Sequence, residues 1–168
     1  FAQQAPKPAD AVMQEAFERA VQENKNVFVI FHASWCGWCR KMDTAMNDVS
    51  VKKFFEDNYV ITHLTVLESD ENKELENPGA EEMYYQYGGG DDQGIPYWLV
   101  FDKDGKLLAD SQIRPEGAGL DEPGQNAGCP AKKEEVAHFI RVLKKTSSLN
   151  KDQLAIIQKR FRENKGGY

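Results

Sequence analysis

The sequence contains no long apolar run and no long basic run. No stretch approaches the ~20 consecutive apolar residues that a helix needs to cross a bilayer, which argues against membrane insertion. Lysine and arginine number 21 against 27 aspartate and glutamate residues, and the formal net charge is −6. Because nucleic acids and anionic membranes attract basic surfaces, neither is an expected partner. The sequence therefore predicts a soluble protein.

Cysteine is scarce, at three residues, and the rest of the composition is typical of one globular domain. The 168 residues are 40% hydrophobic, 29% charged and 11% aromatic, which is enough to bury a core without disulfide support. Very small secreted domains need their cysteines as structural staples, but a chain of this length does not.

The first residues are small, polar and proline-bearing. The chain begins with Phe1 rather than Met, and FAQQAPKPAD is typical of the stretch after a signal-peptide cleavage site. We therefore expect residues 1–9 to form a flexible lead-in. We also expect a periplasmic or otherwise extracytoplasmic location, with the signal peptide removed. The alternative is a chain cut within an arbitrary linker.

Apolar periodicity predicts alternating helices and strands. Runs of β-branched and aromatic residues at 27–32 and 59–67 predict strands buried on both faces. A helix capped by Asp10 precedes the first strand, and a helix with a further turn capped by Ser50 follows it. The apolar residues of that second helix recur at helical spacing, at Trp38, Met42, Ala45, Met46 and Val49.

The second half of the chain combines a hairpin, a long excursion and two helices. A polar loop at 68–79, with its acidic residues in solvent, and a short helix around 80–87 lead to a hairpin with its turn at Asp104-Gly105. The order of elements predicts an α/β fold with a mostly parallel sheet and antiparallel strands at its edge. The remaining segments are a Gly/Pro-rich excursion at 114–130, a helix at 132–145 and, after an Asn150 cap, a final helix at 151–164.

The segment ASWCGWC places two cysteines three residues apart where a strand leads into a helix. Cys36 would lie at the first turn and Cys39 one turn on, so that their sulfur atoms share one face within disulfide range. The positive end of the helix stabilises a thiolate at Cys36, and the thiolate is the nucleophile. We expect Cys36 to attack and Cys39 to resolve the mixed disulfide. A bridge that closes so short a loop adds little stability, which argues against a structural staple.

ASWCGWC, the helix after it, and Ile95-Pro96 ahead of YWLVFD resemble the thioredoxin superfamily over about residues 10–146. The resemblance implies a thioredoxin-like fold, with a mixed central sheet flanked by helices, and dithiol–disulfide exchange that needs no further cofactor. In that family the proline matching Pro96 is cis and packs beside the cysteine pair. The residue matching Ile95 offers backbone hydrogen bonds to an extended substrate peptide. WCGWCRKM is similar to exported thioredoxin-like proteins of bacteria.

Three departures from thioredoxin leave the direction of electron flow and the client protein open. Gly37-Trp38 stands between the cysteines in place of Gly-Pro, and Ile30 takes the place of a buried aspartate thought to serve the resolving cysteine. The chain also carries an insertion at 111–130, before the penultimate helix, and an extra C-terminal helix within 147–168 that we expect to pack on the same domain.

Two tryptophans flank the first cysteine of the motif. Large aromatic residues at such a junction can form a peptide-binding surface. Trp35 and Trp38 are both candidate substrate-binding residues. Trp38 could equally serve the core, and for Trp35 inward packing is the simpler interpretation. Arg40 and Lys41 could raise the positive potential around the thiolate, but a solvated helix face is the simpler interpretation.

Several other groups could take part in redox or metal chemistry. A structural zinc needs four ligands, and the sequence shows no second Cys-X-X-Cys or histidine pair at metal spacing, so we expect no metal site. A copper-type cluster of His32 with the two motif cysteines is the alternative. His63 could act as a proton carrier, although a hydrogen-bonded core histidine is the simpler interpretation. Cys129 is expected to be buried and inert rather than a third redox partner.

The sequence thus predicts a thiol–disulfide oxidoreductase whose catalytic pair is Cys36 and Cys39. Its expected partners are protein disulfides or dithiols and another redox protein that donates or accepts electrons. Gly37 and Trp38 would shape the loop, and Ile95 and Pro96 would hold the substrate strand. The alternative is a thioredoxin-fold binding or assembly module whose cysteines are not used. A peroxidase is disfavoured because no Pro-X-X-X-Thr/Ser-X-X-Cys pattern surrounds Cys36.

Overall fold

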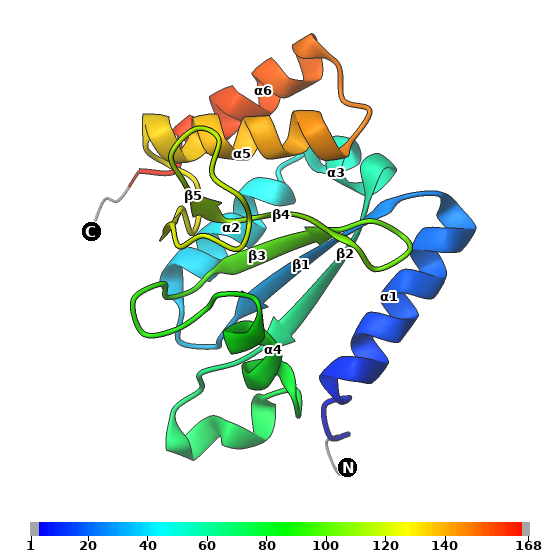
Figure 1. Ribbon diagram of the computed structural model, residues 1–168, viewed down its shortest axis with the longest axis vertical. Coiled ribbons are helices and arrows are strands. Elements are labelled where there is room, and N and C mark those ends of the chain that lie inside the picture. The colour runs from blue at the N-terminus through cyan, green and yellow to red at the C-terminus, as the bar shows by residue number, and fades with distance from the viewer. Residues whose placement is uncertain (1–3, 166–168) are drawn as a thin grey trace.

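A mixed four-stranded sheet in the order β2-β1-β3-β4 forms the centre of the fold (Figure 1). The computed structural model describes residues 4–165. Strand β1 (Asn26–His32) runs parallel to β2 (Tyr59–Thr65) and antiparallel to β3 (Tyr97–Phe101). Strand β4 (Leu107–Asp110) is antiparallel to β3 and follows the expected hairpin turn. The expected mixed central sheet is confirmed.

The expectation of a mostly parallel sheet is wrong, because only the β1–β2 pairing is parallel. Strand β3 lies between β1 and β4 rather than at an edge, and all five of its residues are buried. The edge strands are β2 and β4, and in β2 the side chains of Ile61, Thr62 and His63 stay partly exposed. The prediction that β2 is buried on both faces is therefore also wrong. Local periodicity reports burial along a strand but not its neighbours in the sheet.

Helices cover both faces of the sheet, because alternate residues of a strand point to opposite sides. Phe28 and Ile30 of β1 pack into a core with α2, α3, α5 and α6. Val27, Val29 and Phe31 pack on the other face with α1 and α4. Figure 1 shows α5 and α6 on one side of the sheet and α1 on the other. The helices are α1 (Ala9–Glu23), α2 (Gly37–Met46), α3 (Lys52–Asn58), α4 (Ala80–Gln86), α5 (Lys133–Thr146) and α6 (Lys151–Arg162), with a 3₁₀ helix η1 (Asp70–Leu75).

Two predicted helix caps are wrong. Helix α1 begins two residues early, at Ala9, with Pro8 at the N-cap position, so Asp10 lies in the first turn. Proline suits a helix start because its fixed φ matches the entering chain. Helix α3 begins at Lys52 after a Val51 N-cap, and Ser50 instead donates its hydroxyl to Asp48.

The C-terminal helix begins as predicted, whereas α2 ends before its last predicted residue. The side chain of Asn150 accepts a hydrogen bond from the backbone N–H of Gln153, which confirms the predicted cap. Helix α2 ends at Met46, so Val49 lies beyond it and is 96% exposed. The apolar residues of α6 join the main core, as expected, at Leu154, Ile157 and Phe161.

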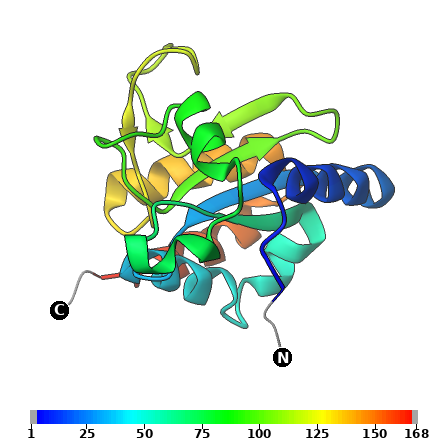
Figure 2. The same cartoon turned by 90° about the horizontal axis from the view of Figure 1, so that it is seen from below.

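The excursion after β4 folds back onto the sheet. It carries a short antiparallel ladder of β5 (Gln112–Ile113) and β6 (Gln125–Asn126), and it extends from one corner of the molecule in Figure 2. The indole N–H of Trp98 in β3 donates to the carbonyl oxygen of Gly128, 2.9 Å away. Arg114 pairs with the nearly buried carboxylate of Asp110.

Within residues 4–165, none of the helices combines the length and apolar character required to cross a membrane.

Candidate active site

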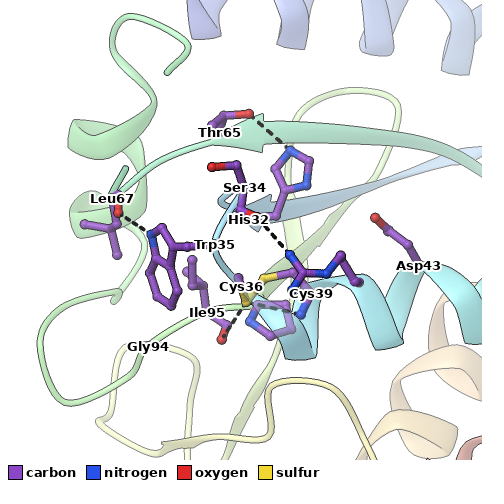
Figure 3. The surroundings of a disulfide bond; sticks show 12 residues. His32, Ser34, Trp35, Cys36, Cys39, Asp43, Thr65, Leu67, Gly94 and Ile95 are labelled. Carbon is purple, nitrogen blue, oxygen red and sulfur yellow. Dashed lines mark hydrogen bonds between the residues drawn. A yellow bond between two sulfur atoms is a disulfide. The ribbon is translucent and has the colours of Figure 1, made fainter. Parts of the chain in front are cut away.

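The two motif cysteines form a disulfide at the start of α2 (Figure 3). Their Cα atoms are 5.3 Å apart, and both side chains are buried. Cys36 occupies the N-cap position with an extended backbone, and its Sγ accepts a hydrogen bond from the N–H of Cys39 at 3.1 Å. Unpaired N–H groups at a helix start favour negative charge, so this position suits the thiolate that forms on reduction.

The cysteine pair lies against a segment that is 59 residues further along the chain. The Sγ of Cys36 is 3.7 Å from the carbonyl oxygen of Ile95, and the Ile95–Pro96 peptide bond is cis, as the resemblance implied. Ala33 and the two cysteines form a small buried cluster, with Trp38 and Ile95 packed against it. The structure thus brings Cys36, Cys39, Trp38 and Ile95 together, with Gly37 as the first residue of α2.

Trp35 does not pack inward, and that prediction is wrong. Its side chain is 58% exposed, and its indole N–H donates to the carbonyl oxygen of Leu67 at 2.8 Å. Leu67 has a left-handed backbone, with a φ of 54°, in the loop after β2. The hydrogen bond fixes one edge of the ring on this loop while the rest of the ring faces solvent (Figure 3).

The same loop holds the segment before the cysteines through a buried carboxylate. Glu68 is 3% exposed and accepts hydrogen bonds from both the backbone N–H and the hydroxyl of Ser34. The prediction of a fully solvated acidic loop is therefore wrong at Glu68. The guanidinium of Arg40 donates to the carbonyl oxygen of Ser34 at 2.8 Å, and the ammonium of Lys41 lies 4.5 Å from the ring centroid of Trp38. These two basic residues thus contact the active loop and are not merely solvated.

A groove of about 600 Å³ opens beside the cysteine pair. Asn126 of the insertion supports one wall, because its amide donates to the carbonyl oxygens of Gln93, at 2.8 Å, and Pro96, at 3.0 Å. No sequence pattern indicated a role for Asn126, since the insertion lacks periodicity. The groove is lined by apolar and basic residues that include Trp38, Ile95, Pro96, Lys132, Arg162 and Lys165.

Cys129 also lines this groove, but its environment disfavours the reactive thiolate form. It is 5% exposed, and its sulfur lies 3.7 Å from the side-chain amide nitrogen of Asn164. Burial raises the pKa of Cys129 to about 12, so the group remains a thiol at neutral pH. The expectation of a buried, inert cysteine is consistent with this environment.

Two histidines and an aspartate lie together on the α2 side of the sheet. His63 pairs with Ile30 in the β1–β2 register, and its Nε2 is 2.9 Å from a carboxylate oxygen of Asp43. The ring of His32 lies 4.8 Å from that of His63. Burial, and secondarily the neighbouring His63, lower the pKa of His32. Asp43 follows Cys39 by one helical turn, and this spacing is visible in the sequence. The spacing alone did not indicate that Asp43 contacts His63, which lies in a different element.

Known proteins resemble the chain over this region. A curated relative, protein disulfide isomerase-like 1-3 of Oryza sativa subsp. japonica, is 27% identical over 85 residues, which cover 50% of this chain and 16% of the rice protein. A disulphide isomerase from Xylella fastidiosa Temecula1 has a TM-score of 0.49 and 21% identity, covering 65% of this chain and 80% of that one. DsbH oxidoreductase has a TM-score of 0.46 and 22% identity, covering 85% of this chain and 86% of its own.

A family model also matches a continuous part of the chain. The thioredoxin-like domain model covers residues 13–116, which is more than half of the 168 residues. This range contains the helix before β1, the cysteine pair, the cis proline and the β3–β4 hairpin. It ends inside the insertion and leaves α5 and α6 outside. The chain belongs to the thioredoxin-like domain family.

Proposed function

We propose that the protein is a thiol–disulfide oxidoreductase that exchanges disulfides with protein substrates. The observation that carries this proposal is the Cys36–Cys39 disulfide at the N-terminus of α2, with the carbonyl oxygen of Ile95 3.7 Å from the Cys36 sulfur. A cysteine pair at a helix start can hold either the bridge or a stabilised thiolate, which a redox cycle requires.

In the reductive direction, the thiolate of Cys36 attacks one sulfur of a substrate disulfide. A mixed disulfide forms, and the other substrate sulfur leaves as a thiolate. The thiolate of Cys39 then attacks the sulfur of Cys36, which releases the second substrate thiol and forms the intramolecular bridge. Two electrons pass to the substrate, and another redox protein must return them to the pair. The oxidative direction is the reverse sequence.

The residues around the pair would present the substrate to it. The backbone of Ile95, next to Pro96, is placed to pair with an extended substrate segment. Trp35 exposes most of its ring beside the disulfide, while Trp38 forms part of the groove wall. Gly37 between these two aromatic residues leaves the approach to Cys36 free of a side chain. We further propose that the protein acts outside the cytoplasm, as a reductant.

A redox titration tests the exchange chemistry. The protein is equilibrated in defined dithiothreitol and glutathione buffers, free thiols are trapped, and mass shifts are measured for each peptide. We expect Cys36 and Cys39 to switch together between a thioredoxin-like ~−270 mV and an oxidant-like ~−120 mV, and the value will give the direction. A pair that never bridges, or that bridges and cannot be reduced, would refute the proposal.

A second candidate is a binding module whose cysteines are not used. It is favoured by the burial of Cys36 and Cys39, at 3% and 2% exposed, beside a groove and an exposed tryptophan. The Cys39→Ser variant separates the two functions. An oxidoreductase with this substitution accumulates mixed disulfides between Cys36 and its substrates, which a reducing gel resolves. A binding module gives no such adducts, and the doubly substituted Cys36→Ser, Cys39→Ser protein retains its cellular role.

A further inference from the structure

His32, Asp43 and His63 come from three different elements and converge on one face of the sheet. His32 ends β1 and lies on the same face as Ile30, two residues earlier, because side chains alternate along a strand. Ile30 pairs with His63 of β2, so the two histidines are diagonal neighbours on this face. Helix α2 packs over Ile30 and contributes Asp43. The three side chains therefore meet where β1, β2 and α2 adjoin.

The donor atoms of the three side chains are close enough to share one ion. One ligand atom from each residue lies within 4.8 Å of those of the other two. Nε2 of His63 and Oδ1 of Asp43 are 2.9 Å apart. Two ligands that each lie ~2.0–2.2 Å from one metal ion are separated by roughly 3–3.5 Å, so these two atoms need to move apart only slightly to chelate an ion. The side chains of His63 and Asp43 are 34% and 39% exposed, which leaves them room to rotate into place.

We propose that His32, Asp43 and His63 form a binding site for a divalent transition-metal ion, with Zn²⁺ as its representative. Two imidazoles and one carboxylate suit borderline ions, whereas Mg²⁺ and Ca²⁺ prefer oxygen ligands throughout. The hydroxyl of Thr65, 3.1 Å from Nε2 of His32, is the kind of second partner that orients a ligating histidine. None of the three ligands is a disulfide cysteine, and the proposed site does not depend on the proposed exchange reaction.

The surroundings of the site leave the ion accessible. Asp43 and His63 also line a polar cavity of about 430 Å³ on the β2 side of the molecule. Three protein ligands leave at least one coordination position open in a tetrahedral complex. That position would face the cavity, where water or a small anion could occupy it. The basic side chains that line the cavity form ion pairs with its acidic ones: Arg19 and Lys25 with Glu23, and Lys52 with Glu56.

The test uses the full, untagged chain in its oxidised form, because a disulfide removes both motif cysteines as thiolate ligands. Calorimetry with Zn²⁺ is expected to show one ion per chain and a raised melting temperature. Addition of Co²⁺ is expected to broaden or shift the imidazole NMR signals of His32 and His63 and to leave those of His138 unchanged. The chain has three histidines, and the His63→Ala and His138→Gln variants each remove one imidazole signal, which assigns all three by elimination.

Substitutions then assign the ligands. His63→Ala and Asp43→Asn are each expected to weaken Zn²⁺ binding by about tenfold or more. His138→Gln and Asp57→Asn are matched controls far from the cluster and are expected to bind Zn²⁺ like the wild type. The proposal is overturned if Co²⁺ perturbs all three histidines equally or none of them. It is also overturned if the folded His63→Ala variant binds Zn²⁺ as tightly as the wild type.

Discussion

The carboxylate of Glu68 accepts hydrogen bonds from both the backbone N–H and the hydroxyl of Ser34, two residues before Cys36. One oxygen of the carboxylate serves each donor, and the side chain is almost entirely buried. The loop after β2 thereby fixes the backbone that leads into the cysteine pair. In the same loop, Leu67 accepts the indole N–H of Trp35.

The first prediction concerns the stability of this connection. Glu68→Ala removes both acceptor oxygens and leaves the backbone N–H and the hydroxyl of Ser34 without their partner. The free energy of unfolding of the oxidised protein should fall by about 1–3 kcal/mol, the usual cost of an unsatisfied buried polar group. Urea unfolding followed by circular dichroism measures it. Glu74→Ala, at an exposed position of η1, is the control, and an equal midpoint for both variants would contradict the prediction.

The second prediction concerns the insertion. Asn126→Ala removes the amide that holds the carbonyl oxygens of Gln93 and Pro96. The wall of the groove that contains Gln93 and Pro96 should become less well ordered. As a result, kcat/KM for a peptide disulfide should fall by about tenfold, whereas kcat/KM for a small aromatic disulfide should change little. Stopped-flow assays with both substrates give the comparison. Gln125→Ala, at the exposed neighbouring position, should behave like the wild type. Equal losses for both substrates would indicate a general structural defect instead.

The third prediction concerns Cys129. Because burial raises its pKa to about 12, the thiol should resist iodoacetamide in the native protein at neutral pH and react once the protein is unfolded. Mass spectrometry of the alkylated peptides measures this, with reduced Cys36 as the internal comparison. Cys129→Ala should leave the reduction potential of the motif pair unchanged. Rapid alkylation of Cys129 in the native protein would contradict this prediction. A shifted reduction potential of the Cys36–Cys39 pair in Cys129→Ala would indicate that Cys129 takes part in the redox reaction.

The fourth prediction concerns pH. Burial lowers the pKa of His138 below its ordinary value, opposed by its hydrogen bond to the carbonyl oxygen of Asp110 and aided by the charge of Arg141. The unfolded chain therefore binds a proton at a pH where the folded chain does not. Stability should be constant above about pH 7 and fall as the pH drops below about 6.5, until His138 also protonates in the folded state.

Urea unfolding between about pH 8 and pH 5 measures this slope. His138→Gln should reduce the slope without abolishing it, because the pKa of His32 is lowered in the same direction. Asp48, whose pKa is lowered to about 2 by hydrogen bonds from Ser50 and Arg160, titrates well below this window. A variant with the full wild-type slope would exclude His138 as a source of the effect.

Local sequence patterns were sufficient for much of the secondary structure. Runs of β-branched and aromatic residues predicted the first two strands, and period-3.6 patterns predicted the helices. The Asn150 cap was predicted correctly because a cap depends on neighbouring residues alone. The predicted cap at Asp10 was wrong by two residues and that at Ser50 by one. At each site several adjacent residues could occupy the N-cap position, and local sequence does not choose between them. The position of Cys36 at a helix start followed from the strand before it and the apolar repeat after it.

The sequence by itself determined the α/β class, the Cys-X-X-Cys pair at a helix start, and the turn of the hairpin, because each depends on residues within one or two turns of chain. Only the tertiary structure decided that β3 lies inside the sheet, that Glu68 is buried against Ser34, and that His32, Asp43 and His63 converge. These features join residues from separate elements. Their proximity depends on strand order and helix packing, which local periodicity does not encode.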